Sequence, residues 1–476
     1  MATAVATRSA ESGRPLAPAF DAVDRPDREG ILDCVHCGLC LPSCPTYLTT
    51  GLEMASPRGR IHLMRAVDEG QAGISADFVK HLDQCLGCLA CQTACPSGVP
   101  YGYLLEAART QIERRYERPA GDRRLRRVIL SLFPHPARLA WLLGALSWYQ
   151  RLGLSGVVRN TGLLALLSPR LARMEALLPE VPSAAARRPL PEVTPAVGQR
   201  LGRVGFLTGC VQRFVLPDLN RATARVLAAA GYEVVTPQGQ GCCGALHLHS
   251  GDLEAGRALA RRTIQAFERA QVDLVAVNAA GCGAAMKEYG HLLRDDAEWR
   301  SRAEAFSARV RDVSQILAGV SWRQELKPVP VTVTYHEACH LAHAQRVRKE
   351  PRLILQRIPD LQLVELPESD LCCGSAGVYN LLQTEMAGRL LQRKIDRIRE
   401  TGASVVAIGN VGCLLQIGLG LRQAKLPVRT VHPVELVDWS LHGMPDGEPR
   451  VEKTPDFEPR TSNLERRTLN VEPRTR

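Results

Sequence analysis

Apolar residues recur at helical spacing through the N-terminal quarter of the chain. The segment 56–70 has an apolar stripe of this period, with Ser56 placed to cap a helix and Gly70 placed to end it. Further helices are predicted over 75–84 and 104–112, where apolar residues keep the same spacing. The pattern therefore predicts an N-terminal domain that is helical rather than β-rich.

The C-terminal half instead alternates short apolar runs with helical segments. Strand-like runs lie at residues 204–210 and 331–339, and continuous apolar runs typical of buried strands lie at 272–282 and 404–413. Each of the four runs ends at a cysteine. This alternation predicts two α/β units with parallel sheets.

Changes in composition divide the chain into further segments. Polar, proline-rich or highly charged stretches at both ends predict disorder, and a proline-rich stretch over 179–200 predicts a linker. The predicted segments are a disordered N-terminus (1–29), the helical domain (30–117), a helical connector with its linker (118–200), the first α/β unit (201–300), a second connector (301–330), the second α/β unit (331–442) and a disordered tail (443–476).

Two features bear on where the protein acts. The N-terminus has no apolar core of signal-peptide length, and the most apolar stretch, 128–149, is broken by two prolines, a histidine and an arginine. It predicts one or two amphipathic helices suited to a partner or a membrane surface. We therefore expect a cytoplasmic protein, with peripheral attachment at the inner face of the cell membrane as an alternative.

The charge balance narrows the choice of partners. The net charge of +11 over 476 residues comes mostly from arginines spread through the chain. This charge favours an anionic partner or an acidic membrane surface. No basic patch interleaved with aromatic residues occurs, so the sequence does not predict a nucleic-acid partner.

Eight of the sixteen cysteines fall in two short runs, each spaced C-x2-C-x2-C-x3-C-P. This is the spacing of two-cluster bacterial ferredoxins, in which three thiolates bind one cluster and the fourth reaches the other. One [4Fe–4S] cluster is then assigned to Cys34, Cys37, Cys40 and Cys95, and the second to Cys85, Cys88, Cys91 and Cys44. Zinc sites are the alternative, but zinc ribbons use two separated pairs of cysteines.

The other eight cysteines form an internal repeat. A single cysteine, a Cys-Cys-Gly turn and a second single cysteine occur twice, with offsets of 129 to 131 residues. Each set is expected at the carboxyl ends of strands, with its Cys-Cys-Gly turn opening a helix whose N-terminus favours thiolate charge. The sets are Cys210, Cys242, Cys243 and Cys282 in the first copy, and Cys339, Cys372, Cys373 and Cys413 in the second.

The segment 335–343 contains the spacing His-Glu-x-x-His of zinc proteases. In such enzymes both histidines lie on one helix, whereas here a β-branched alternating run precedes His336 and places it where a strand ends. We therefore do not predict a protease. His336, His340 and His343 remain candidates to line a site near the cysteines of the second repeat, against the alternative that they are ordinary loop histidines.

These motifs together resemble the iron–sulfur subunit of bacterial glycolate oxidase (glycolate dehydrogenase). The resemblance runs from about Gly30 to about Trp439 and is carried by CVHCGLCLPSCPTY, ASPRGRIHLMR, QCLGCLACQTACPSGVPYG, TGCVQ, CCGALHLHSG, YHEACHLAH and CCGSAGVYNL. It implies an α+β multidomain fold, in which an N-terminal α-helical ferredoxin with two [4Fe–4S] clusters is followed by two tandem α/β cysteine-rich CCG repeats.

The resemblance also implies a function shared with other chains. In the family, partner subunits carry FAD and oxidise glycolate to glyoxylate, and the iron–sulfur subunit passes the electrons on towards the membrane quinone pool. No convincing nucleotide-binding motif occurs in this chain. We therefore expect substrate oxidation on a flavin-bearing partner and no catalytic residue here.

One departure from the family pattern leaves open whether the repeats bind a metal. The fuller repeat of heterodisulfide reductase resembles C…CCG…C-x2-C, with five ligands for an extended cluster, whereas Cys282 and Cys413 each lack the second cysteine of that final pair. A further metal centre at the repeats and reduced thiols are both compatible with the residues. The alternatives for the whole chain are the iron–sulfur subunit of a lactate or anaerobic glycerol-3-phosphate dehydrogenase, a disulfide-reductase-like subunit active at the CCG sites, and a zinc scaffold.

Overall fold

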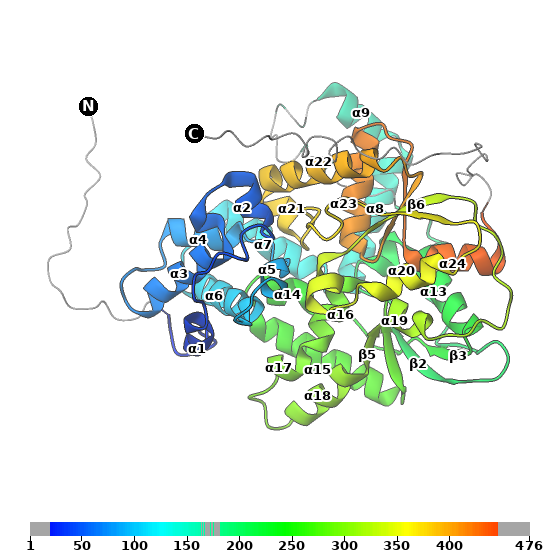
Figure 1. Cartoon of the computed structure of the whole chain (residues 1–476), viewed down its shortest axis with the longest axis horizontal. Coiled ribbons are helices and arrows are strands. Elements are labelled where there is room, and N and C mark those ends of the chain that lie inside the picture. Colours follow the sequence, from blue (N-terminus) through cyan, green and yellow to red (C-terminus); the bar gives the residue numbers. More distant parts are fainter. Residues whose placement is uncertain are drawn as a thin grey trace, which may run out of the picture.

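The fold is described from a computed structural model, which places residues 20–162, 164, 166, 172, 175 and 181–445. A helical domain lies at one end of the molecule, and a helical connector and two α/β repeats form the rest (Figure 1). Its helices are α1 (Arg28–Leu32), α2 (Pro45–Thr50), the 3-10 helix η1 (Glu53–Ala55), α3 (Pro57–Asp68), α4 (Ala76–Asp83), α5 (Ala90–Thr93) and α6 (Tyr101–Arg115).

The helices predicted from periodicity in this domain are confirmed. Ser56 caps α3 by accepting a hydrogen bond from the Gly59 N–H, and Ser75 caps α4 in the same way. The apolar stripe of α3 is buried against α4 and α6, which forms the core of the domain. The long loops between these helices carry most of the cysteines.

Part of the N-terminal segment expected to be disordered is packed. Phe20 is buried, and its ring lies 6.2 Å from that of Phe78 on α4. Asp24 accepts two hydrogen bonds from Arg257 of the first repeat. The prediction of disorder is therefore wrong for residues 20–29, because one aromatic anchor and one ion pair hold this polar segment. Residues 1–19 and 446–476 lie outside the described residues.

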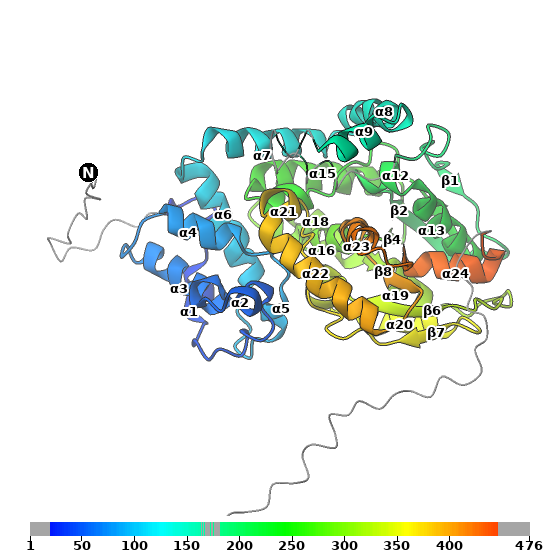
Figure 2. The ribbon, with the colours of Figure 1, turned by 90° about the horizontal axis from the view of Figure 1, so that it is seen from above.

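A helical connector joins the helical domain to the repeats. It consists of α7 (Ala120–Leu132), α8 (Pro136–Arg151) and α9 (Leu154–Thr161). The first two helices meet at a bend of 104° and lead from the helical domain across to the first repeat (Figure 2). Among the described residues no single helix has the length and apolar character to cross a membrane, although α7 and α8 taken together pass that test.

The first repeat is built on a five-stranded sheet of order β1-β3-β2-β4-β5, parallel except for β1. The edge strand β1 lies in the segment predicted to be a linker. The elements are β1 (Val193–Thr194), β2 (Gly202–Leu207), α12 (Gln212–Val215), α13 (Pro217–Ala229), β3 (Tyr232–Val235), α14 (Ala245–His249), α15 (Leu253–Arg269), β4 (Leu274–Val277), α16 (Ala280–Lys287), α17 (Tyr289–Leu292), α18 (Arg300–Arg309), β5 (Val310–Asp312) and α19 (Val313–Ala318).

The second repeat has a four-stranded parallel sheet of order β7-β6-β8-β9, which matches β3-β2-β4-β5 strand for strand. Its elements are β6 (Thr332–His336), the π-helix η2 (His340–Ala344), α20 (Lys349–Gln356), β7 (Gln362–Val364), α21 (Tyr379–Leu382), α22 (Thr384–Glu400), β8 (Val405–Ile408), α23 (Val411–Gln423), β9 (Arg429–Val431) and α24 (Pro433–His442).

The match between the sheets corrects one predicted boundary. The first repeat was predicted to end at residue 300, but β5 pairs with β4 inside its sheet. The strand is only three residues long, which is too short to show an alternating pattern. One hydrophobic core spans both sheets and includes Phe206 of the first repeat and Tyr335 of the second. The two repeats are therefore packed as one body.

Candidate metal centres

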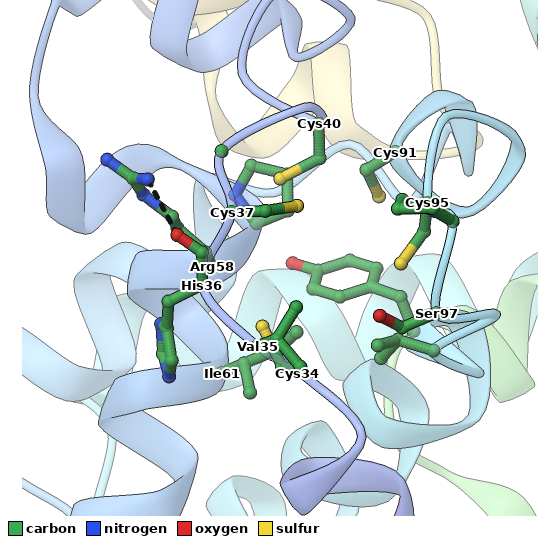
Figure 3. A pocket seen from close by; sticks show the side chains of 15 residues that line it. Cys34, Val35, His36, Cys37, Cys40, Arg58, Ile61, Cys91, Cys95 and Ser97 are labelled. Carbon is green, nitrogen blue, oxygen red and sulfur yellow. Dashed lines mark hydrogen bonds between the residues drawn. The ribbon is translucent and has the colours of Figure 1, made fainter.

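The first predicted cysteine set lines one cavity. Cys34, Cys37, Cys40 and Cys95 surround it together with Cys91 of the other set. Figure 3 shows their sulfur atoms around a common space, with the side chains of His36 and Arg58 turned away from it. Cys37 is exposed and Cys34, Cys40 and Cys95 are half-buried, so this cavity lies at the surface of the helical domain.

The second predicted set lines a neighbouring cavity. Cys44, Cys85, Cys88 and Cys91 all face it, and all four are buried. Cys44 precedes Pro45 at the start of α2, which turns its side chain away from the loop of the first set. Cys91 lines both cavities, so the two sites adjoin. Each cavity offers the four thiols that a cubane cluster requires.

A buried arginine compensates charge at the second cavity. Arg60 is 1% exposed, and it donates hydrogen bonds to the backbone oxygen of His81 and to Thr46 Oγ1 at 2.8 and 3.0 Å. Burial raises the pKa of the Cys85 thiol, but the charges of Arg60 and Arg109 outweigh burial, so the net shift is downward. At Cys91 no such cation acts, and burial raises the pKa of its thiol. The two cations thus favour negative charge at Cys85, whereas burial disfavours it at Cys91.

The four cysteines of the first repeat gather where β2 and β4 end. Cys210 follows β2, and the Cys242-Cys243 pair lies directly before α14. Cys282 lies in the first turn of α16 rather than at the end of a strand. The thiols form a chain of neighbours in which Cys242 contacts Cys210 and Cys243 contacts Cys282. The four cysteines of the first repeat thus lie together, as the sequence predicts.

The second repeat repeats this arrangement with one difference in its turn. Cys413 lies in the first turn of α23, as Cys282 does in α16. The Cys372-Cys373 pair is followed by a loop, and α21 begins only at Tyr379, so the prediction that this turn opens a helix is wrong. Gly374 after the pair has φ +86°, as does Gly244 in the first repeat. Both glycines therefore occupy a conformation that other residues rarely adopt.

The three candidate histidines of the second repeat have different surroundings. His336 ends β6 and lies close to Cys373 and Cys413. His340 Nδ1 lies 3.7 Å from Cys339 Sγ, and the His340 ring stacks on His249 of the first repeat. His343 instead hydrogen-bonds Thr93 of the helical domain. His336 lies on a strand and His340 on a π-helix, so the two do not share a helix face. They therefore do not form the site of a zinc protease.

The second repeat also adjoins the second cysteine set of the helical domain. Burial, followed by the neighbouring thiolate of Cys339, raises the pKa of Cys88. The Tyr379 hydroxyl donates to the backbone oxygen of Gln84 at 2.9 Å, one residue before Cys85. Cys88, Cys339 and Cys372 are packed in one buried cluster. The two sites therefore meet across the domain boundary, where Cys88 lies near Cys339 and Cys372.

Two cations near these sites were not singled out from the sequence. Arg60 lies on the apolar face of α3, and Lys394 lies on the apolar face of α22 between Leu390 and Ile398. Lys394 is 1% exposed and donates to the backbone oxygen of Glu368, and burial lowers its pKa to about 8. A charged residue at an apolar position of a helix is the signal that could have found both.

Family models match most of the described chain. A model described as "4Fe-4S dicluster domain" matches residues 30–99, and one described as "Glycolate oxidase iron-sulfur subunit, linker region" matches residues 121–178. A third, described as "Cysteine-rich domain", matches twice, over residues 204–287 and 333–418. The predicted fold class, a helical cluster domain followed by two cysteine-rich repeats, is confirmed.

Similar proteins share most of this length. The probable glycolate oxidase iron-sulfur subunit of Bacillus subtilis (strain 168) is 42% identical over 420 residues, which cover 87% of this chain and 95% of that protein. The glycolate oxidase iron-sulfur subunit of Escherichia coli (strain K12) is 34% identical over 413 residues, 86% of this chain and 93% of that protein.

Two more distant similarities concern half of the chain and the fold. Lactate utilization protein A of Bacillus pumilus (strain SAFR-032) is 29% identical over 237 residues, which cover 50% of this chain and 99% of that protein. A crystal structure of a hypothetical protein from Helicobacter pylori superposes with a TM-score of 0.51 at 8% identity, over 84% of this chain and 70% of that one. The latter shows a likeness of fold alone.

Proposed function

The chain belongs to the family of glycolate oxidase iron–sulfur subunits, and from this premise we propose that it relays electrons from a flavin-bearing subunit that oxidises glycolate. The coarser role, an iron–sulfur electron-transfer subunit of an oxidoreductase, follows from the family itself. The substrate, the flavoprotein partner and the acceptor are the proposal. The observation that supports it best is the pair of adjoining cavities, each lined by the four cysteines of one predicted set.

The chain's residues fit two [4Fe–4S] clusters. We assign Cys34, Cys37, Cys40 and Cys95 to one cluster and Cys85, Cys88, Cys91 and Cys44 to the other, since these sets line the two cavities. When bound, such clusters accept and release single electrons. The protein supplies the thiolates, shields the second site from water and places Arg60 beside it to offset its negative charge.

The surface around the first site is suited to a partner protein. Exposed apolar side chains surround the half-buried cysteines, and two of them, Val35 and Leu39, belong to the cysteine loop itself with exposed fractions of 69% and 59%. Large exposed apolar side chains beside a cofactor site favour contact with a partner. The flavoprotein docks here in our proposal, because Cys37 is the most accessible cluster ligand. The other exposed apolar residues nearby are Leu32, Leu48, Leu52 and Met54.

The connector supports a lipid surface as the place where electrons leave. Trp141 and Trp148 of α8 are 77% and 68% exposed, and Leu152, just after α8, is 64% exposed. The preceding helix α7 carries exposed arginines, such as Arg123 at 52%. Tryptophans and cationic side chains together are typical of helices that lie on an anionic membrane. Peripheral attachment by this connector brings the chain to a membrane quinone.

The experiment is cluster reduction by substrate in the reconstituted complex. The chain and its co-purifying flavoprotein are mixed anaerobically, glycolate is added, and the clusters are followed by electron paramagnetic resonance. We expect reduced-cluster signals with glycolate and none without the flavoprotein. Lactate and glycerol-3-phosphate are the parallel arms, because Lactate utilization protein A is similar over half of this chain. Reduction by lactate alone would reassign the substrate, and no reduction by any of the three would reject the relay.

The docking surface has its own test. Val35→Glu with Leu39→Glu should weaken flavoprotein binding while the iron and sulfide content stays unchanged, because neither side chain is a thiol ligand. Trp141→Ala with Trp148→Ala is the matched control on the other surface. It should leave flavoprotein binding intact and reduce sedimentation with vesicles of anionic phospholipid. Unchanged flavoprotein binding in the first variant would contradict docking at this site.

A further inference from the structure

A cavity in the first repeat is lined by four arginines and, among the described residues, by no acidic side chain. Its volume is about 120 Å³, and its lining includes Thr208, which follows β2, and Thr236, which follows β3. Ligands of open parallel sheets bind outside the carboxyl ends of the strands, as this cavity does. The four arginines are Arg187, Arg188, Arg213 and Arg221.

Arg213 has no counter-ion in this cavity. It is half-buried, and within the described part of the chain its side chain forms no ion pair and no hydrogen bond. Its guanidinium instead lies over the ring of Phe214, 5.1 Å from the centroid. Burial lowers the pKa of Arg213, and only the thiol of Cys210 acts in the opposite direction. A half-buried cation of this kind favours a negatively charged occupant.

Two further arginines line the cavity from the segment before β1. Arg188 is exposed and has no acidic partner in the described ranges, and Arg187 Nε donates to the backbone oxygen of Pro182 at 3.1 Å. Arg221 on α13 is the exception, because it pairs with Asp218 at 2.6 Å. Three of the four arginines therefore have no carboxylate of the described chain to neutralise them.

Buried polar groups fix the wall of the cavity. Asn220 of α13 donates to the backbone oxygen of Thr208 at 2.9 Å, and Gln240 Oε1 accepts from the Thr208 N–H at 2.9 Å. All three residues line the cavity and are buried. The first turn of α13 also contributes to the lining and has no side-chain cap, so the positive end of this helix adds to the attraction for an anion.

The second repeat has a carboxylate at the corresponding place. The register of β2 with β4 matches that of β6 with β8, which makes Glu337 the equivalent of Thr208. Glu337 is buried and pairs with Arg352 at 2.6 Å and with Arg348 at 3.1 Å. The second repeat thus neutralises two arginines with its own side chain. The first repeat has the arginines and lacks the carboxylate.

We propose that this cavity of the first repeat binds a phosphate group, which neutralises its arginines as Glu337 neutralises those of the second repeat. Planar guanidinium groups donate two hydrogen bonds at once to phosphate oxygens, and several of them match its double charge. The cavity is smaller than the roughly 300–1,000 Å³ of sites that enclose drug-sized ligands, so it fits the phosphate rather than a whole larger molecule. This site is independent of the electron relay.

Two sources supply this chemistry, free phosphate and the headgroup of an anionic phospholipid. Phe214, next to Arg213, packs against Leu139 and Leu143 of α8. The same helix carries the exposed tryptophans that we assign to a lipid surface. The cavity therefore adjoins the helix on which a membrane would lie.

The first test is the binding of inorganic phosphate to the full chain, purified anaerobically without phosphate. Isothermal titration calorimetry at physiological ionic strength, where exposed charges are screened, should give about one phosphate per chain. Arg213→Met should weaken binding about 10- to 100-fold, because charge-assisted hydrogen bonds are lost. Arg389→Met, which removes an exposed arginine of α22, is the matched control and should leave the affinity unchanged. An unchanged affinity in Arg213→Met would overturn the proposal.

A second pair of variants tests the comparison with Glu337. Thr208→Glu installs the residue of the second repeat and should weaken phosphate binding at least about 100-fold, because it brings a carboxylate to the arginines. Thr208→Gln has the same size without the charge and should weaken it at least about tenfold less. Equal losses would show that size alone decides, and would contradict a phosphate in the role of the carboxylate.

Vesicles of phosphatidylglycerol separate the two sources. If the headgroup is the ligand, Arg213→Met should sediment with the vesicles less than the wild type, and inorganic phosphate should compete with them. If free phosphate is the ligand, both chains should sediment equally while their calorimetry differs. A wild-type chain that binds neither phosphate nor vesicles in a way that depends on Arg213 rejects the site.

The same variant contains its own control for folding. Because Arg213 makes no hydrogen bond with the described chain, Arg213→Met should keep the Tm and the iron content of the wild type when phosphate is absent. Added phosphate should raise the Tm of the wild type and not that of the variant, since only a ligand of the native state stabilises it. An equal rise in both chains would contradict binding at this cavity.

Discussion

The two cysteine-rich repeats have the same scaffold and different surroundings for the same four cysteines. Their sheets match strand for strand, and their Cys-Cys-Gly turns share a glycine at φ +86°. By the match of β2 to β6 and of α15 to α22, the second repeat has His336 and Lys394 where the first has Leu207 and Thr263. An imidazole and a buried cation favour negative charge on the neighbouring thiols, and an apolar and a neutral side chain do not. Duplication has thus kept the backbone while two side chains changed the chemistry.

The repeats also differ in how they hold the helical domain. The second places Cys339 beside Cys88 and is fastened by the hydrogen bond from Tyr379 to Gln84. The first repeat is held by Arg109 of the helical domain, which donates to the backbone oxygen of His249 in that repeat. Arg109 also donates to the backbone oxygens of Leu82 and Cys85 in its own domain. The second repeat therefore brings its own cysteines beside a cluster site, and the first contacts the helical domain through polar side chains such as His249, which hydrogen-bonds Glu106.

The largest expected difference between the repeats is in their turn glycines. A Cβ on Gly374 would lie 2.7 Å from the backbone oxygen of Ala387, whereas one on Gly244 would lie 3.3 Å from that of Gly256. Both substitutions carry the cost of a left-handed alanine, about 1–2 kcal/mol, and Gly374→Ala adds about 1–3 kcal/mol of overpacking. Anaerobic thermal unfolding should show a clearly lower Tm for Gly374→Ala. Equal Tm values would mean that the two turns are equally packed.

The contacts to the helical domain give the next largest effect. Arg109→Met removes three charge-assisted hydrogen bonds to backbone oxygens and should cost about 2–4 kcal/mol, because each is worth more than a neutral one. Tyr379→Phe removes one neutral hydrogen bond and should cost about 1 kcal/mol. Urea unfolding followed by tryptophan fluorescence measures both. A larger loss from Tyr379→Phe would reverse the roles assigned to the two repeats.

A third prediction concerns the buried lysine of the second repeat. Lys394→Thr installs the residue of the first repeat and should cost about 1–3 kcal/mol, because the backbone oxygens of Glu368 and Ser369 lose a charged donor. Urea unfolding measures the loss. Thr263→Val is the control on the first repeat and should cost less. An unchanged stability in Lys394→Thr would show that these hydrogen bonds do not hold the turn.

The smallest expected effect concerns the helical domain. There Arg60 lies near Cys85, as Lys394 lies near Cys373 in the second repeat. Arg60→Met removes a buried positive charge and should lower the potential of the adjoining cluster by about 60 mV, which is tenfold in a one-electron equilibrium. A redox titration followed by electron paramagnetic resonance resolves this shift. The potential of the cluster at the exposed site should change less, and equal shifts would argue against a local effect.

The sequence predicts the parts of this molecule that depend on local spacing. The two cysteine runs, the capped helices α3 and α4 and the repeat of strands and Cys-Cys-Gly turns are all patterns within short segments. Because the offsets of the repeat vary only from 129 to 131 residues, the gathering of each cysteine set could also be predicted. The family resemblance follows from the same motifs and is confirmed by relatives that share most of the chain.

What the sequence does not predict depends on contacts between distant residues. His336 is one of three candidate histidines in its segment, and only the register of β6 shows which one meets Cys373 and Cys413. The strand β5 is too short to be recognised before it pairs with β4. Phe20 lies in a polar segment, and its burial depends on a contact with Phe78. In each case a tertiary contact decides what local composition leaves open.

The most direct test of this account is the metal content of the wild-type chain after anaerobic purification. Two cubane clusters predict about eight iron atoms and about eight acid-labile sulfides per chain. Zinc in place of that iron would contradict the assignment of clusters to the two cavities. Fewer than about four iron atoms would contradict the electron relay itself.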